Sequence, residues 1–170
     1  KGTSAGAVFT GYNFKGLEQN FEPLGLDHIY LVKNPGLEDY DPVSRCSAVC
    51  CVIKKIKPEI VLGGATGIGR ALLPRIAVRL QTGLTADCTE LDIDPETGLL
   101  MQTRPAFGGN VMATIVCPEN RPQMATVRPH VMTAADCKVK PEVHTIEISD
   151  KECKSFSETV SFEKTDKGES

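Results

Sequence analysis

The sequence predicts an α/β protein with three layers around a mostly parallel sheet. Strand-like apolar runs alternate with helix-like segments over residues 4–80, a pattern typical of parallel sheets with right-handed crossovers. From residue 83 onward, shorter strand-like runs separated by turns predict an additional hairpin-rich portion. A length of 170 residues is enough for one domain with a buried core.

Composition narrows the classes of function. The chain is 41% hydrophobic and 24% charged, with a formal net charge of -3. Its basic residues are scattered rather than gathered in a stripe, which argues against nucleic-acid binding. No apolar run approaches the ~20 residues needed to cross a bilayer, so we expect no membrane insertion.

The first elements are expected to be a strand over residues 4–11, a short helix over 14–24 and a strand over 27–32. A helix should follow, because Asp41 can cap it with Pro42 at its first position, and it should end before Pro58.

Residues 59–64 then read as a buried strand, and Thr66 is placed to cap a second helix that continues to about residue 80. Pro74 lies within that helical pattern. It either kinks the helix or marks a regular helix that begins only around Ala71.

Strand-like runs follow at 86–94, 98–103, 110–117 and 123–129. From residue 133 the chain is charged and irregular, with one possible strand at 143–149. We therefore divide the chain into an α/β domain, residues 1–132, and an extended strap or linker, residues 133–170.

The segment "LGGATGIGRA", residues 62–71, has the glycine spacing of a dinucleotide-binding turn, with Gly63, Gly67 and Gly69 as the key positions. Its context does not fit a short-chain dehydrogenase, since two strands and two helices precede it and no Tyr-x-x-x-Lys motif follows. Glycines that permit a tight strand-to-helix turn are the favoured interpretation.

The chain has seven cysteines without paired C-x-x-C units, which fits neither a disulfide framework nor a zinc ribbon. Cys46 and Cys50 share a helical face, but core packing is the better explanation for them. The three histidines are far apart in sequence, and we expect surface or packing roles for them. No metal site is therefore predicted.

Three arginines at the second helix, Arg70, Arg75 and Arg79, have no acidic residue nearby in sequence. Arg75 and Arg79 share a helical face, and the three side chains could grip an anionic partner. A solvated helix face is the alternative interpretation.

The most informative segment is "TGLTADCTELDIDPETGLLMQTRPAFGGNVMATIVCPENRPQMATVRPHVM", residues 82–132. It closely resembles the alpha subunit of electron transfer flavoproteins. The resemblance continues back through "KPEIVLGGATGIGRALLPRIAVRL", residues 57–80, and more loosely to residues 24–32. About the first three-quarters of the chain is covered.

The resemblance implies an N-terminal domain with an adenine nucleotide alpha hydrolase-like fold that docks to a beta subunit. FAD would be held by a C-terminal domain of alpha that this chain lacks. The family also has a further strand and helix before the position of Ser4. The first residue is Lys1, with no initiator methionine, and we expect the chain to be a processed or incomplete piece of a longer one.

Site residues also follow from the resemblance. Arg104 corresponds to an arginine that reaches across the subunit interface towards a flavin bound by beta, with Gly108, Gly109 and Asn110 beside it. A guanidinium at that position stabilises a reduced, anionic flavin. An interface salt bridge is the alternative role for Arg104. The expected partner interface comprises Arg70, Arg75, Arg79, Thr85 and Phe107.

The resemblance implies electron transfer with FAD in a heterodimer. The expected partner enzyme is an acyl-CoA dehydrogenase of fatty acid β-oxidation or a related flavin-dependent dehydrogenase. Some members of the family also bifurcate electrons. The chain alone is expected to be an electron carrier subunit rather than a catalyst. A bacterial cytoplasm is the expected location, or the mitochondrial matrix for a eukaryotic protein. The alternatives are an NAD(P)-dependent oxidoreductase that uses the 62–71 loop and a universal-stress-like nucleotide-binding module.

Overall fold

The computed structural model describes residues 3–17, 21, 24–133, 139–153, 155 and 159–161. Over these residues the chain forms three three-stranded sheets and two α-helices. Two of the sheets are parallel and the third is antiparallel. The predicted α/β class is confirmed, although two parallel sheets occur among these residues where the sequence predicted one. None of the described helices is long and apolar enough to cross a membrane.

The first sheet has the order β1-β2-β9, with β1 at Gly6–Gly11, β2 at His28–Lys33 and β9 at Glu142–Glu147. One of its faces packs against α1 (Pro42–Ile56). That core contains Val32, Leu37, Ala48, Val52, Ile148 and Cys153. A second apolar cluster includes the alternate β2 residues Ile29 and Leu31, together with Phe21. Because successive strand residues point to opposite faces, this sheet is covered on both sides.

Helix α1 begins and ends as its sequence predicts. The carboxylate of Asp41 accepts a hydrogen bond from Ser44 N at 2.7 Å, and Pro42 occupies the first turn, where its missing N–H costs nothing. At the other end Lys57 has φ 54°, a left-handed conformation that terminates the helix just before Pro58.

Between β2 and α1 lies the short 3-10 helix η3 (Pro35–Leu37), which begins at Asn34. The Asn34 amide donates to Ile148 O at 2.9 Å and to the Asp150 carboxylate at 3.0 Å. The segment directly after β9 is therefore fixed to the N-terminal half of the domain.

The second sheet has the order β3-β8-β4, with β3 at Ile60–Gly64, β4 at Leu84–Cys88 and β8 at Gln123–Val127. Helix α2 (Gly67–Leu80) packs on this sheet and on α1. Their shared core contains Cys46, Cys50, Ile53, Leu73, Ile76, Ala77 and Met124. The helix continues through Pro74, and Thr66 caps it by accepting from Gly69 N at 3.1 Å.

Two glycines of the 62–71 loop are required by this packing. A Cβ on Gly69 would lie 1.8 Å from Gly64 O, and one on Gly63 would lie 2.7 Å from Leu73 Cδ2. A Cβ on Gly67 would meet nothing within 4 Å. The first turn of α2 therefore approaches β3 more closely than any other residue type would allow.

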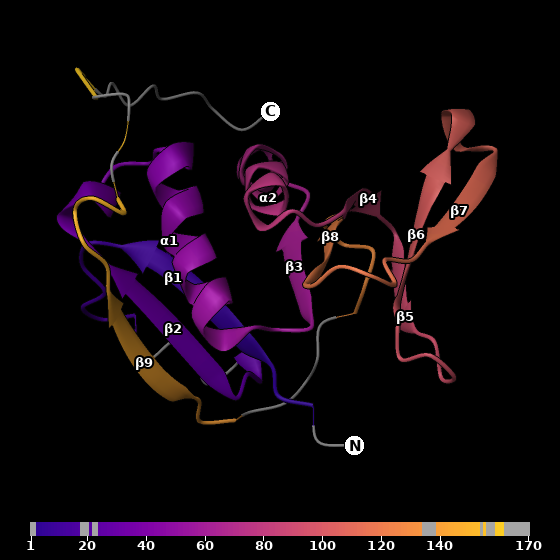
Figure 1. The fold of residues 1–170 in the computed structure, drawn as a ribbon, viewed down its shortest axis with the longest axis horizontal. Helices are drawn as coiled ribbons and strands as arrows, with labels where there is room; N and C mark the ends of the chain where they lie inside the picture. Colours follow the sequence, from indigo (N-terminus) through magenta and orange to yellow (C-terminus); the bar gives the residue numbers. More distant parts are fainter. Residues whose placement is uncertain are drawn as a thin grey trace.

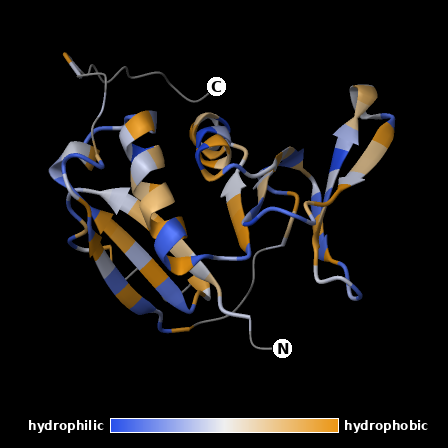
Figure 2. Cartoon of the chain, viewed as in Figure 1, coloured by the Kyte–Doolittle hydropathy of each residue, from blue (hydrophilic) through white to orange (hydrophobic). Residues whose placement is uncertain are grey.

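The third sheet has the order β5-β6-β7, with β5 at Glu90–Ile93, β6 at Leu100–Ala106 and β7 at Val111–Ile115. The short 3-10 helix η4 (Phe107–Gly109) joins β6 to β7. We call residues 90–115 the arm, because Figure 1 shows it extending from the second sheet, on the side away from the first. Figure 2 shows hydrophobic residues on η4 and on β7, at the end of the arm.

Three strands lie where the sequence did not predict them. Strands β4 and β8 were expected in the hairpin-rich portion, but both belong to the parallel second sheet, with β8 between β3 and β4. Strand β9, expected as part of a strap, completes the first sheet by pairing with β2. Of the short helix expected at 14–24, residues 18–20, 22 and 23 lie outside the described residues, and the described residues 14–17 form a turn rather than a helix. A division of the chain at residue 132 stays a prediction.

Candidate functional site

A cavity of about 460 Å³ lies where the arm meets the carboxyl end of β8. Its lining residues are Arg104, Pro105, Ala106, Phe107, Gly108, Gly109 and Arg128. All but Arg128 come from one continuous stretch of β6 and η4. Three of the four residues that the sequence analysis grouped around a flavin therefore line one cavity. The fourth, Asn110, is exposed at the end of η4 and is not among its lining residues.

The turn from β6 into β7 depends on two glycines. Gly108 has φ 75° and Gly109 has φ 91°, values in a region that side chains rarely adopt. A Cβ at either position would meet nothing within 4 Å. The conformation, rather than crowding, is what requires glycine at both positions, and it leaves bare backbone facing the cavity.

Phe107 precedes these glycines and projects into solvent. It is 90% exposed and has φ 46°. The neighbouring strand β7 adds Val111 and Met112, which are 50% and 53% exposed. Exposed apolar residues at the edge of a polar cavity are typical of a docking site.

The cavity has a positive electrostatic character. Arg104 and Arg128 both line it, and Arg104 forms a hydrogen bond from Nε to Pro105 O at 3.3 Å. Among the described residues no carboxylate forms an ion pair with Arg104. Burial raises the pKa of the nearby Cys88 thiol, and the positive charge of Arg104 partly opposes that rise. The Arg104 guanidinium is therefore available to an anionic group.

One acid, Asp87, lies behind the cavity. Its carboxylate is 2.7 Å from Arg70 Nη2 and 3.6 Å from Arg128 Nη2, and its side chain is only 18% exposed. Asp87 is held in place by its own backbone, because its N–H donates to Thr126 Oγ1 at 2.9 Å. The acid neutralises one positive charge and orients Arg128, so that two arginines, Arg70 and Arg128, share a single carboxylate at this edge.

The local backbone explains how Asp87 reaches this position. It has φ 67°, and the pairing of β4 with β8 shifts register between Thr85 and Cys88, as at a β-bulge. Bulges of this kind redirect a side chain next to a site. Arg128 N donates to Cys88 O at 3.0 Å, so the same irregularity also positions Arg128.

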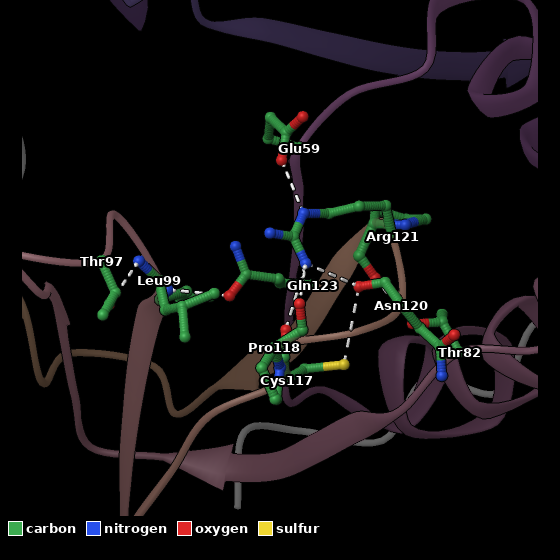
Figure 3. Close-up of polar contacts among 11 residues, drawn as sticks. Glu59, Thr82, Thr97, Leu99, Cys117, Pro118, Asn120, Arg121 and Gln123 are labelled. Atoms are coloured by element: carbon green, nitrogen blue, oxygen red, sulfur yellow. Dashed lines mark hydrogen bonds and ion pairs between the residues drawn. The ribbon is translucent and has the colours of Figure 1, made fainter.

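A network around Arg121 joins the connection between β7 and β8 to the residue before β3 (Figure 3). Arg121 Nε lies 2.6 Å from Glu59 Oε2, and its Nη1 donates to the carbonyl oxygens of Cys117, Pro118 and Asn120. The buried Gln123 side chain accepts from Leu100 N at 2.8 Å, which ties the start of β6 to the start of β8. The start of the arm is thus held to the strand whose other end borders the cavity.

Comparison with protein families gives a match over residues 1–151 to the model described as electron transfer flavoprotein domain. The chain belongs to the electron transfer flavoprotein family. The resemblance seen in residues 82–132 is thereby confirmed.

Relatives of this electron transfer flavoprotein chain come from several bacteria. It is 57% identical over 135 residues to the electron transfer flavoprotein subunit alpha of Thermoanaerobacterium thermosaccharolyticum, covering 79% of this chain and 41% of that protein. It is 47% identical over 130 residues to the subunit of the same name from Megasphaera elsdenii, covering 76% and 38%. It is 38% identical over 164 residues to the lactate dehydrogenase (NAD(+),ferredoxin) subunit LctC of Acetobacterium woodii, covering 95% and 39%. The chain thus spans about two-fifths of the length of these relatives.

The three arginines of α2 do not act together in this electron transfer flavoprotein chain. Arg70 pairs with Asp87 beside the cavity, although no acidic residue is near it in sequence. Arg75 and Arg79 instead border a separate, mostly apolar groove between α1 and α2. There Arg75 donates to Ala71 O, and Arg79 donates to Ser47 Oγ across the groove.

Thr85 was also expected at the partner interface, and that role stays a prediction. The residue is 7% exposed within β4. Phe107, by contrast, is among the most exposed residues of the described chain.

Sequence reasoning missed Arg128 and Asp87 of the electron transfer flavoprotein cavity. Both lie at or next to the carboxyl ends of parallel strands, which is where ligands bind in open α/β sheets. The signal was present in the sequence, since Arg128 directly follows an apolar strand. It could be used only if β8 had been recognised as parallel to β3 and β4.

Proposed function

We propose that this chain is the N-terminal part of an electron transfer flavoprotein alpha subunit, which docks to a beta subunit through the arm and presents Arg104 to a flavin that the partner holds. The observation that carries this proposal is the coincidence of three features in one stretch of β6 and η4. These are the cavity, the Arg104 guanidinium, which has no acidic partner among the described residues, and the exposed Phe107.

The shape of the arm supports docking. Its hydrophobic residues Phe107, Val111 and Met112 are half or more exposed in the isolated chain. Aromatic and methionine side chains are enriched at protein interfaces. A partner that covered them would also close the cavity, which would shield the charge of Arg104 from water and strengthen its effect on a bound anion.

The residues of the cavity fit the edge of a flavin. A flavin supplies the exchange of one or two electrons, and its reduced form carries negative charge on the ring system. Arg104 and Arg128 supply the complementary positive charge, and the bare backbone of Gly108 and Gly109 allows a planar ring to approach closely. We propose FAD as the flavin of the complex, with the alpha-bound FAD held by the C-terminal domain expected from the family.

The physiological role that we propose is the relay of electrons to or from an acyl-CoA dehydrogenase or a related flavin-dependent dehydrogenase in the bacterial cytoplasm. Electron bifurcation is the second candidate, because one relative is named as a lactate dehydrogenase (NAD(+),ferredoxin) subunit and another as an acryloyl-CoA reductase electron transfer subunit. A bifurcating complex should need both a low-potential and a high-potential acceptor for turnover, whereas a simple relay needs one.

The competing function, a dinucleotide grip at residues 62–71, receives no support from the loop. Gly63 and Gly69 are accounted for by the packing of α2 on β3. The universal-stress-like alternative does not explain the arm, which such a module would not need.

The decisive variant is Arg104→Gln in the assembled complex of full-length subunits. A unit charge ~4 Å from the flavin contributes about 1 kcal/mol even in a water-like medium. That energy corresponds to about 40 mV for a one-electron step, given that a tenfold change in equilibrium is about 59 mV. We expect the midpoint potential of the flavin at the interface to become at least about 40 mV more negative.

The matched control is Arg75→Gln, which removes the same charge from α2 on the groove side, away from the cavity. It should leave the flavin potential unchanged. Gel filtration of both variants separates an electrostatic effect from failed assembly. Equal potentials in wild type and Arg104→Gln, in complexes that assemble normally, contradict the proposed role.

A further inference from the structure

Three side chains that the proposed function does not use meet on one face of the first sheet. His28 lies on β2, and Glu142 and His144 lie on β9. In the parallel register His28 is opposite Glu142 and Tyr30 is opposite His144, so all four side chains share a face. Sequence spacing predicted only surface or packing roles for these histidines. The two histidines are 116 positions apart in the sequence, and only the pairing of β2 with β9 brings them together.

The three ligand atoms lie close to the geometry of a metal site. His28 Nδ1 is 3.2 Å from His144 Nε2, and Glu142 Oε2 is 3.6 Å from the first nitrogen and 3.7 Å from the second. In a tetrahedral zinc site with bonds of about 2.0–2.1 Å, ligand atoms are separated by about 3.3–3.4 Å. A cation could bind here after movements of only a few tenths of an ångström.

Neighbouring side chains hold the two histidines in this arrangement even without a bound ion. The Tyr30 ring stacks on His144, with centroids 5.0 Å apart and planes 16° apart, which restricts rotation of the imidazole. The two histidine side chains are about one-third exposed, and Glu142 is 68% exposed. The pair of rings is therefore held in position on an ordered sheet, while the carboxylate leaves one side of the cluster open to solvent.

We propose that His28, Glu142 and His144 form a binding site for a divalent cation of the zinc type. Two imidazoles and one carboxylate suit zinc and its neighbours in the first transition row, whereas calcium and magnesium prefer oxygen ligands alone. Three protein ligands leave a fourth coordination position for water, as in open zinc sites. This site is distinct from the arginine-lined cavity, which lies at the other sheets and involves none of these residues.

The physical consequence of binding is a bridge between β2 and β9. The backbone ladder already joins the two strands, and Asn34 fixes the segment after β9. A cation would add a third connection at the opposite end of β9, where the chain arrives from residues 139–141. The ion therefore stabilises the position of the last strand of the domain relative to the first sheet.

The test uses the full-length protein with any partner chain that copurifies, freed of metal with a chelator and then titrated with zinc chloride by isothermal titration calorimetry. We expect one equivalent of zinc per chain. Glu142→Gln and His144→Gln should each weaken binding by more than about tenfold, since even residues that only support ligands contribute this much. Zinc should also raise the melting temperature of the wild type and not that of Glu142→Gln.

The control is His130→Asn, which removes the one histidine outside the cluster. Asparagine tolerates the φ of 62° at that position. Binding should be unchanged in this variant. Glu142→Gln alters an exposed side chain, so it keeps the test valid if His144→Gln proves unstable.

The thiols need a separate measurement, because cysteines also bind zinc. Counting reactive thiols before and after zinc addition distinguishes the two ligand sets, and the count should not change. The absence of zinc binding, equal affinity in Glu142→Gln, or protection of thiols by zinc would each overturn the assignment.

Discussion

The glycine-rich loop at residues 62–71 provides a sharp test of how the fold is held together. We consider the substitution Gly69→Ala, which adds one methyl group to the first turn of α2. The new Cβ would lie 1.8 Å from Gly64 O, whereas real Cβ atoms essentially never approach closer than 3.0 Å. The helix would have to retreat from β3 by more than an ångström, because a backbone oxygen in a paired strand cannot move aside.

The energetic cost follows from what that retreat disturbs. Leu73 and Ile76 of α2 are 7% and 1% exposed and belong to the core shared with α1 and β8. Overpacking against flexible side chains costs about 1–3 kcal/mol, and a clash between two backbones should exceed that range. We therefore expect a loss of at least about 3 kcal/mol, equivalent to a fall of about 6–12 °C in melting temperature for a chain of this size.

Gly67→Ala is the matched control in the same loop. Nothing lies within 4 Å of its added Cβ, and alanine is favoured over glycine in helices by about 1 kcal/mol, so stability should stay equal or rise. Both variants are compared by thermal melting followed by circular dichroism. A Gly69→Ala protein as stable as the wild type would refute the packing argument. Equal loss of nicotinamide binding in both variants would instead revive the dinucleotide interpretation.

Three further outcomes are expected. Burial, reinforced by Cys46, raises the pKa of the Cys50 thiol to about 12. The thiol therefore stays protonated in the folded chain where the unfolded chain ionises, and stability should fall above pH ~9 by up to about 1.4 kcal/mol per pH unit. Under reducing conditions, urea midpoints at about pH 8 and pH 10 should differ less in Cys50→Ala than in wild type, and an equal difference contradicts this. Asp87→Asn should cost about 1–2 kcal/mol in urea unfolding, a value discounted because Arg70 and Arg128 are about half exposed, and an unchanged midpoint would count against the ion-pair cluster. Phe107→Asn should leave stability unchanged, since the side chain is 90% exposed, but weaken association with the partner chain by about tenfold or more in sedimentation experiments. Full retention of that association would remove the arm from the interface.

Local signals in the sequence were sufficient for the helices. Asp41 and Thr66 act as caps, and the first helix ends before Pro58, as predicted. These features depend on residues three or four positions apart, for which the physical rules are strong. The structural role of Gly69 is also a local signal, because a tight turn from a strand directly into a helix favours glycine.

Local sequence signals did not predict which strands, distant in sequence, pair with one another. The strand at 123–127 has the same character as its neighbours in the arm, and only the completed sheet shows that it inserts between β3 and β4. Strand β9 looked like a strap because it is short and polar on one side. Its place in the core depends on β2, more than a hundred residues earlier.

The sequence predicted only part of the candidate site, because the rest depends on the pairing of strands that are distant in sequence. The family resemblance carried Arg104, Gly108 and Gly109, which lie within one stretch of chain. Asp87 lies behind the cavity at a bulge in β4, and Arg128 lines the cavity from the end of β8. Both positions become apparent only once β8 is known to pair in parallel with β3 and β4. The histidine cluster was missed because it joins two strands that are adjacent only in the folded sheet.

We propose that the cavity beside Arg104 faces a flavin held by a partner chain. A structure of the complex formed by the full-length subunits with flavin bound would test this directly. We expect the partner to cover Phe107 and the Arg104 guanidinium to contact the flavin ring. A complex in which the arm is exposed to solvent and every flavin lies away from Arg104 would contradict it.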